Sequence, residues 1–138
     1  MPLNPFMRLG NRMAVSSVRR TGKFMGMSLI ALDTVGAKSG ERRSAPVASF
    51  PLPDGGWIVV ASAGGGPHNP GWFYNLLAHP DQVVVEAAGR RTPVTPVQLA
   101  GEERERAIAD LLARAPRFSG YFDKATREIP IVRLEPRG

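Results

Sequence analysis

Two stretches of the chain carry residues that could bind an anion and a flat ring. The first, residues 32–43 (LDTVGAKSGERR), follows an apolar run, turns between glycines and supplies Lys38 and two arginines. The second, residues 60–75 (VASAGGGPHNPGWFYN), contains three consecutive glycines, an Asn-Pro pair and three adjacent aromatic residues. Glycine-rich turns present backbone N–H groups to anions, and lysine and arginine add positive charge. Together the stretches predict a site for a ligand with an anionic tail and a planar head.

Each of these motifs also has a purely structural interpretation. Lys38 and Arg43 fit a solvated basic hairpin equally well, because residues 36–40 lack the spacing of a Walker A loop. Consecutive glycines describe a flexible loop as well as a close approach of backbone to ligand. Trp72 and Asn75 are three residues apart and share one face of a predicted helix, which suits a planar heterocycle. Adjacent aromatic residues on a helix point in different directions, however, so one or two of them must enter the core.

Composition limits the class of protein. The 138 residues are 43% hydrophobic and 22% charged, as expected for one globular domain with its own core. The chain has no cysteine, which fits a reducing cytosol and excludes a disulfide framework and a thiolate nucleophile. Its two histidines have no acidic residue at ligand spacing, so we expect no metal site. The net charge of +6 attracts polyanions, but no nucleic-acid-binding motif accompanies it, so we expect no nucleic-acid partner.

The N-terminal residues 1–25 form a separate basic, weakly amphipathic segment. Residues 3–21 carry apolar and basic residues at helical spacing, although Gly10 and Asn11 weaken the helix. Such a segment either packs on the edge of the domain or lies on a membrane surface. The chain has no run of 18 apolar residues and no signal-peptide pattern. We therefore expect a cytoplasmic protein, with peripheral contact at the inner face of the membrane as an open alternative.

The remaining residues, 26–138, predict a single domain rich in strands. Strands are expected at 27–32, 45–52, 57–61, 82–87, 91–99 and 129–134, and helices at 70–78, 101–115 and 118–126. The turn at 53–56 (PDGG) makes the two strands beside it antiparallel, and Asn69-Pro70 is typical of a helix start. This order predicts a mainly β or α+β fold: a small antiparallel barrel of about six strands with covering helices.

The set of motifs resembles the deazaflavin-dependent nitroreductase family, which uses the coenzyme F420. The matching blocks are residues 34–43, 61–65 (ASAGG), 69–76 (NPGWFYNL) and 129–132 (IPIV), with Pro80 and the helix start at 101–104 also fitting. They span residues 28–136 in the family's order. The resemblance implies a split β-barrel related to FMN-binding proteins. It also implies an F420H2-dependent oxidoreductase that transfers a hydride to a small electron-poor acceptor such as a quinone or nitro compound.

The resemblance also implies which residues form the site. The coenzyme positions are Ala37, Lys38, Ser39, Arg43, Ser44, Ala45, Pro46, Val60, Ala61, Ser62, Ala63, Gly71, Trp72, Phe73, Tyr74, Asn75 and Phe118. The acceptor positions are Ala48, Phe118 and Tyr121. No obligatory acid–base residue is expected, because the coenzyme carries the hydride. Tyr121 or Ser62 would serve by hydrogen-bonding or polarising the acceptor.

The chain departs from the best-known members of that family in ways that bear on substrate and cofactor. Ala63 stands where they carry a lysine, and Ala48, Ala115 and Phe118 stand where tyrosines line the pocket. We therefore expect one cation fewer for the coenzyme tail and a more open, less polar pocket that disfavours nitroimidazoles. Two alternatives remain open at this point: an FMN-dependent oxidoreductase, and a non-enzymatic lipid- or fatty-acid-binding barrel. The sequence leaves the physiological acceptor open, and fits a monomer or a homodimer.

Overall fold

The computed structural model describes residues 5–21, 23–24, 27–62 and 67–137. The strands are β1 Lys23–Phe24, β2 Met27–Val35, β3 Arg42–Pro51, β4 Trp57–Val60, β5 Val83–Ala87, β6 Arg90–Gln98 and β7 Ile131–Pro136. The α-helices are α1 Pro5–Thr21, α2 Gly71–Ala78, α3 Gly101–Arg114 and α4 Ser119–Lys124, with short 3-10 turns η2 Pro80–Gln82 and η3 Pro116–Phe118. Every predicted strand and helix is present, and β1 is an additional short strand.

The strands form a closed antiparallel barrel. Their order is β1-β2-β3-β4-β7-β6-β5, and pairing of β2 with β5 closes the ring while β1 extends outside it. All of the pairings are antiparallel, as between Leu32 and Val85 at the point of closure. The predicted six-stranded barrel with covering helices is confirmed.

Side-chain alternation along the strands separates an interior core from two outer clusters. On β2, Ile30 and Leu32 point into the barrel, whereas Ala31 points outward. Phe73 and Leu76 of α2 join the interior core, so this helix packs against the inside of the barrel. Apolar side chains alternate in the same way on β4, where Val59 faces inward.

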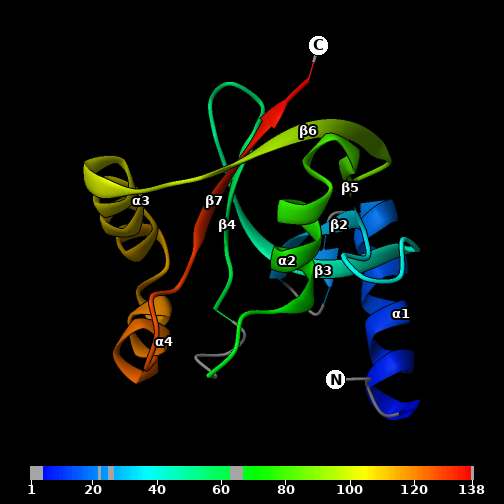
Figure 1. The fold of residues 1–138 in the computed structure, drawn as a ribbon, viewed down its shortest axis with the longest axis horizontal. Helices are drawn as coiled ribbons and strands as arrows, with labels where there is room; N and C mark the ends of the chain where they lie inside the picture. Colours follow the sequence, from blue (N-terminus) through cyan, green and yellow to red (C-terminus); the bar gives the residue numbers. More distant parts are fainter. Residues whose placement is uncertain (1–4, 22, 25–26, 63–66, 138) are drawn as a thin grey trace.

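The helices cover opposite outer faces of the barrel. Helix α1 lies against β2, β3 and β5, with Val15 and Val18 packed on Ala31, while α3 and α4 cover the other side (Figure 1). The backbone amides of Ala88 and Gly89, in the β5–β6 turn, donate to the last carbonyl groups of α1. Among the described residues, no helix combines the length and apolar character needed to cross a membrane. The division of the chain at residue 25 stays a prediction.

Several element ends differ by one or two residues from the sequence-based expectation, and two differences lie near the expected site. The β2–β3 hairpin is longer than predicted, because pairing continues past Leu32 to Val35, which lies opposite Arg42. Polar residues in this stretch suggested a loop, but strand pairing satisfies their backbone groups. Helix α2 begins at Gly71 rather than at Pro70, and no side chain caps its first turn. The Asn69 side chain is bonded elsewhere, as described below.

Candidate functional site

The turn between β2 and β3 is a tightly built hairpin loop. The Gly36 amide donates to the Glu41 carbonyl at 2.7 Å, the Gly40 amide to the Gly36 carbonyl at 3.0 Å, and the Glu41 amide to Ser39 Oγ at 3.1 Å. A side chain at position 36 would place its Cβ 2.4 Å from Ser39 Oγ, and Gly40 has φ +71°, so glycine is favoured at both positions. Several of the amides that the sequence offered to an anion are therefore used within the turn itself.

One amide side chain joins the two stretches that the sequence singled out. Asn75 on α2 accepts a hydrogen bond from the Ala37 amide at 2.9 Å and donates through Nδ2 to Thr34 Oγ1 at 3.2 Å. The glycine-bracketed hairpin and the aromatic helix are thus held in contact. Asn75 was expected to bind the ring of a ligand, and the structure gives its side chain these two protein partners.

The hairpin carries positive charge that the described carboxylates balance only in part. We call the turn at residues 36–41, the flanking strand residues Arg42 and Arg43, and Asn75 the hairpin end. Lys38 and Arg42 are exposed, and none of the described carboxylates lies within ion-pair distance of either. Arg43 faces Glu41 at 3.5 Å, with both side chains exposed. An anion approaching this end meets cations whose charge is largely available to it.

The aromatic helix divides its predicted site residues between core and surface. Phe73 is buried in the interior core, and Trp72 is half-buried against it. Gly71 and Tyr74 are exposed, and nothing lies near the Cβ position of Gly71. Trp72 and Gly71 are therefore the positions of α2 best placed to face a ligand.

Two of the expected coenzyme residues on the strands belong to the barrel interior. Ala45 on β3 and Ala61 after β4 pack with the interior core. Their side chains are thus committed to packing, and they can contribute to a ligand site only through backbone atoms. Ser44 and Pro46 alternate with Ala45 and therefore lie on the outer face of β3.

Ser44 is part of an ionic cluster beneath α1. Its hydroxyl donates to Asp33 Oδ1 at 2.6 Å and accepts from Arg19 Nη2 at 2.8 Å. Arg19 also pairs with Asp33 at 3.3 Å and with Glu86 at 2.5 Å, and Arg91 contacts both acids. This cluster anchors α1 on the barrel, so the structure gives Ser44 a role besides the one expected at the coenzyme.

The two acids of this cluster respond to their surroundings in opposite directions. Burial raises the pKa of the Asp33 carboxyl above its ordinary value of 3.8, with a smaller contribution from the charge of Glu86, and the Ser44 hydrogen bond and the Arg19 charge offset this only in part. Burial also acts to raise the pKa of Glu86, but the Arg91 hydrogen bond and the Arg19 charge outweigh it and lower that pKa. Asp33 thus retains its proton more readily than Glu86.

The expected acceptor residues come together on the outer face covered by α3 and α4. Phe118 is 4% exposed and stacks edge-on with Tyr121, with ring centroids 5.3 Å apart. Ala48 and Val60 belong to the same cluster. We call Ala48, Phe118 and Tyr121 the acceptor wall. Ala48, Ala115 and Phe118, which stand where the best-known family members carry tyrosines, all belong to this cluster.

Part of the predicted site lies outside the described residues. Ala63 and the three glycines at 64–66 fall in that gap. Ser62, just before it, is half-buried, and its carbonyl oxygen accepts a hydrogen bond from Arg127 at 3.0 Å.

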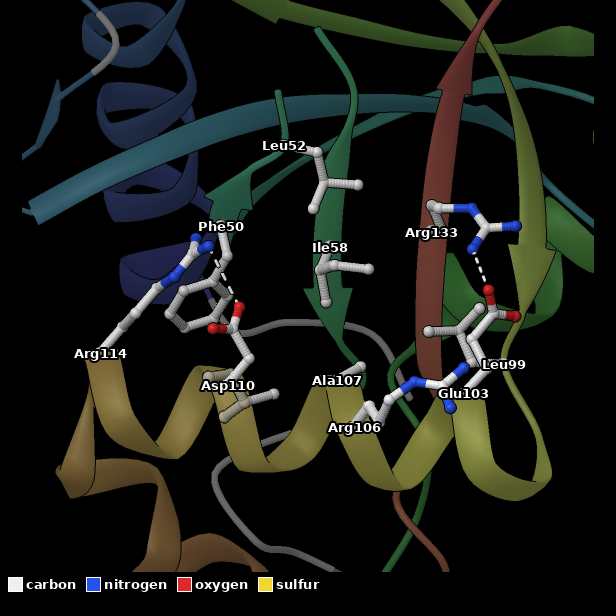
Figure 2. Close-up of a pocket in the computed structure, with 11 residues that line it drawn as sticks. Phe50, Leu52, Ile58, Leu99, Glu103, Arg106, Ala107, Asp110, Arg114 and Arg133 are labelled. Atoms are coloured by element: carbon white, nitrogen blue, oxygen red, sulfur yellow. Dashed lines mark hydrogen bonds and ion pairs between the residues drawn. The ribbon is translucent and has the colours of Figure 1, made fainter. Parts of the chain in front are cut away.

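A separate pocket lies under α3, on the far side of Phe50 from the acceptor wall. Its volume is about 300 Å³, and its floor is formed by the apolar residues Phe50, Leu52, Ile58, Leu99, Ala107 and Leu111 (Figure 2). Its rim pairs Arg133 with Glu103 at 2.5 Å and Arg114 with Asp110 at 3.1 Å. We call this the α3 pocket. None of the residues expected to bind coenzyme or acceptor lines it, although Phe50 on its wall stacks edge-on with Phe118 of the acceptor wall, with ring centroids 5.5 Å apart.

Two functional residues were missed by the sequence analysis. Asp33 is 5% exposed within an apolar strand, and an acid in such a run is itself a signal of a buried polar contact. Arg127 bonds to the loop between β4 and α2, but it lies alone in an irregular segment, so no periodicity or spacing marked it.

Comparison with known proteins gives consistent matches. The family model described as F420H(2)-dependent quinone reductase matches residues 7–136. An F420H(2)-dependent quinone reductase of Mycobacterium tuberculosis (strain H37Rv) is 33% identical over 111 residues, which are 78% of this chain and 73% of the relative.

Solved structures give the same result for the fold. One described as an F420-H2 dependent reductase is 34% identical, with a TM-score of 0.68, and the match covers 78% of this chain and 93% of the other. Another, described as a domain-swapped dimer, is 30% identical, with a TM-score of 0.70. The match covers 94% of this chain and 93% of the other.

Proposed function

The chain belongs to the F420H(2)-dependent quinone reductase family, and we propose that it transfers a hydride from reduced F420 to a quinone-type acceptor between the hairpin end and the acceptor wall. The contact of Asn75 with Ala37 carries this proposal, because it brings the cationic hairpin and the aromatic helix into one place. A coenzyme with an anionic tail and a flat ring needs both.

Family membership confirms three predictions from the sequence. The protein is an oxidoreductase, its coenzyme is F420, and its fold is the barrel shared with a solved F420-H2 dependent reductase. The resemblance to deazaflavin-dependent nitroreductases is confirmed only in its coarser part, the F420-dependent reductase. The description of the matching family names quinones, not nitro compounds, as the acceptors. Reduction of nitro compounds therefore stays a prediction.

The hairpin end fits the anionic part of the coenzyme. Lys38 and Arg42 face no described carboxylate, and Arg43 meets only exposed Glu41. We propose that Lys38 and Arg43 hold the phosphate and glutamate tail by charge-assisted hydrogen bonds. Ala37 and Asn75 keep the turn at a fixed distance from α2.

The ring would lie beside the exposed side of α2. Gly71 leaves open space there, and half-buried Trp72 supplies a flat surface. The coenzyme supplies the hydride, and the protein binds, orients and excludes water. No side chain is required to give or take a proton for this transfer itself.

The acceptor wall would then orient the acceptor. Phe118 is buried and packs edge-on against Tyr121, while half-buried Tyr121 has a hydroxyl that can donate to a quinone carbonyl oxygen. Replacing Tyr121 with Phe keeps the ring and removes only that donor. Turnover of the variant with a quinone is expected to fall by about tenfold, and unchanged turnover would remove this role.

The test of the proposed function is a fluorescence titration with oxidised F420, with FMN titrated beside it. Micromolar or tighter binding of F420 alone, followed by oxidation of reduced F420 in the presence of a water-soluble quinone, is the expected result. Binding of FMN alone would keep the fold and overturn the coenzyme. Running a nitroimidazole as a parallel acceptor decides the nitroreductase prediction.

Two predictions about assembly go beyond family membership. A solved relative is a domain-swapped dimer, which supports the homodimer over the monomer for this chain. Membrane contact through residues 1–25 would have to avoid Val15 and Val18, because these pack on the barrel. Light scattering of the purified chain and its sedimentation with anionic liposomes test the two.

A further inference from the structure

One arginine holds both described ends of the loop between β4 and α2. Arg127 lies in the segment between α4 and β7. Its Nη2 donates to the carbonyl oxygens of Ala61 at 3.1 Å, Ser62 at 3.0 Å and His68 at 3.1 Å. Its Nη1 donates to Asn69 Oδ1 at 2.5 Å. A single half-buried guanidinium therefore joins the end of a barrel strand to the residues that precede α2.

A guanidinium suits this position for a geometric reason. It presents five donors in one rigid plane, whereas a lysine ammonium is a compact charge with three donors. The acceptors of Arg127 are three carbonyl oxygens and one amide oxygen, so the cation meets dipoles and no described carboxylate among these partners. Hydrogen bonds from a charged donor are stronger than neutral ones, and together they fix the spacing between strand and helix.

The parts that Arg127 joins are the parts that must face one another in the proposed site. Asn69 is followed by Pro70 and then by α2, which carries Trp72 and the Asn75 contact to the hairpin. On its other side, Arg127 follows α4, which carries Tyr121 of the acceptor wall. The same residue thus links the coenzyme side of the site to the acceptor side.

We propose that Arg127 is a positioning residue of this enzyme, which sets α2 and the end of β4 at the distance from the acceptor wall that hydride transfer requires. It acts through the backbone of Ala61, Ser62 and His68 and touches neither coenzyme nor acceptor. The inference rests on the proposed function for its consequence in catalysis, but the anchoring itself is a property of the protein without coenzyme.

The first experiment measures the anchoring alone. Amide hydrogen exchange is followed by mass spectrometry in the coenzyme-free wild type, Arg127→Ala, Arg127→Lys and the matched control Arg106→Ala, whose described ion pair is an exposed contact within α3. Exchange in peptides covering residues 58–76 is expected to rise about tenfold or more in Arg127→Ala, with β5 and β6 unchanged. The control should match the wild type. Unchanged exchange in 58–76, or an equal rise throughout the chain, would overturn the proposal.

The second experiment measures the consequence for the site. The dissociation constant for F420 is expected to rise about tenfold or more in Arg127→Ala, less in Arg127→Lys and not in Arg106→Ala. Guanidinium chloride at a low, non-denaturing concentration should restore binding to Arg127→Ala, while sodium chloride at equal concentration should not. Local exchange that rises without any change in coenzyme affinity would contradict the positioning role.

The two experiments separate this inference from the proposed function. If the wild type does not bind F420, the proposed function fails, and the exchange measurement still decides whether Arg127 anchors the loop. If the wild type binds F420 and Arg127→Ala binds it equally well, the function stands and the positioning role falls.

Discussion

The hairpin end and the α3 pocket are both rich in basic side chains, yet they treat those charges differently. Around the α3 pocket, Arg133 lies 2.5 Å from Glu103 and Arg114 lies 3.1 Å from Asp110 (Figure 2). At the hairpin end, Lys38 meets no carboxylate of the described residues. The basic side chains at the α3 pocket are thus paired with acids, whereas Lys38 at the hairpin end is not paired with any described acid. An anionic ligand is therefore drawn to the turn rather than to the α3 pocket.

The two regions also differ in what their polar side chains hold. At the α3 pocket, Arg133 and Arg114 pair mainly with the carboxylates of Glu103 and Asp110, although Arg114 also donates to the Pro51 carbonyl oxygen. Ion pairs near the surface contribute little to stability. Asn75 and Arg127 instead bond to backbone atoms of the hairpin and of the loop before α2. Bonds to the backbone fix the course of the chain, which is what a binding site requires.

The largest effect on F420 binding is expected from removing the positive charges of the hairpin end. Replacing Lys38 and Arg43 together with alanine should raise the dissociation constant for F420 by about tenfold to hundredfold, because two charged donors to the tail are lost. Arg114→Ala, on the rim of the α3 pocket, is the matched control and should bind like the wild type. Isothermal calorimetry or fluorescence quenching measures both. Equal losses in the two variants would mean that overall charge, rather than this turn, attracts the coenzyme.

A smaller effect is expected where the hairpin meets α2. Asn75→Ala removes the partner of the Ala37 amide and of Thr34, and should lower the free energy of unfolding by about 1–3 kcal/mol. Asn75→Asp keeps an acceptor for Ala37 and should lose less. Urea denaturation of the three proteins gives the values. A loss in Asn75→Asp as large as in Asn75→Ala would show that the Ala37 contact contributes nothing.

The ionic cluster beneath α1 is a third arrangement of charge, to be compared with the hairpin end and the α3 pocket. Its charges are paired, but one of its acids, Asp33, is buried. The raised pKa of Asp33 means that the folded protein holds this proton more readily than the unfolded chain, so ionisation costs stability as pH rises through the folded pKa. Asp33→Asn lacks that cost. The melting temperature of this variant should therefore rise relative to that of the wild type as pH increases from about 4. Glu86 has a lowered pKa and contributes stability above its ordinary value of 4.5.

Thermal unfolding at a series of pH values tests this, with Glu86→Gln as the control of opposite sign. Glu86→Gln should lose ground against the wild type as pH rises toward about 4.5 and keep a constant deficit above it, since it lacks the ionised partner of Arg19 and Arg91. A constant difference between Asp33→Asn and the wild type across the whole range would contradict the raised pKa.

The smallest effect is expected at the α3 pocket. Ala107→Leu places a larger apolar side chain in the cavity and should change the free energy of unfolding by about 1 kcal/mol or less. The dissociation constant for F420 should stay within about twofold of the wild type. A clear loss of F420 binding would place this pocket in the coenzyme site and reverse the comparison.

Much of the fold followed from local sequence patterns. Short apolar runs bounded by turn residues predicted the strands, and Ile108, Leu111 and Leu112 at helical spacing predicted α3, because these patterns reflect burial. The hairpin end was predicted from Lys38 and the glycines around it, because these residues lie next to one another in the sequence.

The rest depended on contacts between distant residues. Nothing local to Asn75 shows that it reaches Ala37, and nothing local to Arg127 shows that it bonds to Ala61. Residue type also could not show which expected site residues face inward: Ala45 and Ala61 pack in the core because of strand register, which closure of the barrel sets.

The β5–β6 turn that bonds to the end of α1 has a consequence for the order in which the protein forms. The carbonyl groups of Val18 and Arg19 accept hydrogen bonds from the amides of Ala88 and Gly89. These two residues are synthesised much later than α1, so the bonds cannot form until then. Pairing of β2 with β5 spans a similar separation. Long-range contacts of this kind are closed late and slowly. During synthesis α1 can pack on β2 and β3 first, while its C-terminal hydrogen bonds form only in the late step that closes the barrel.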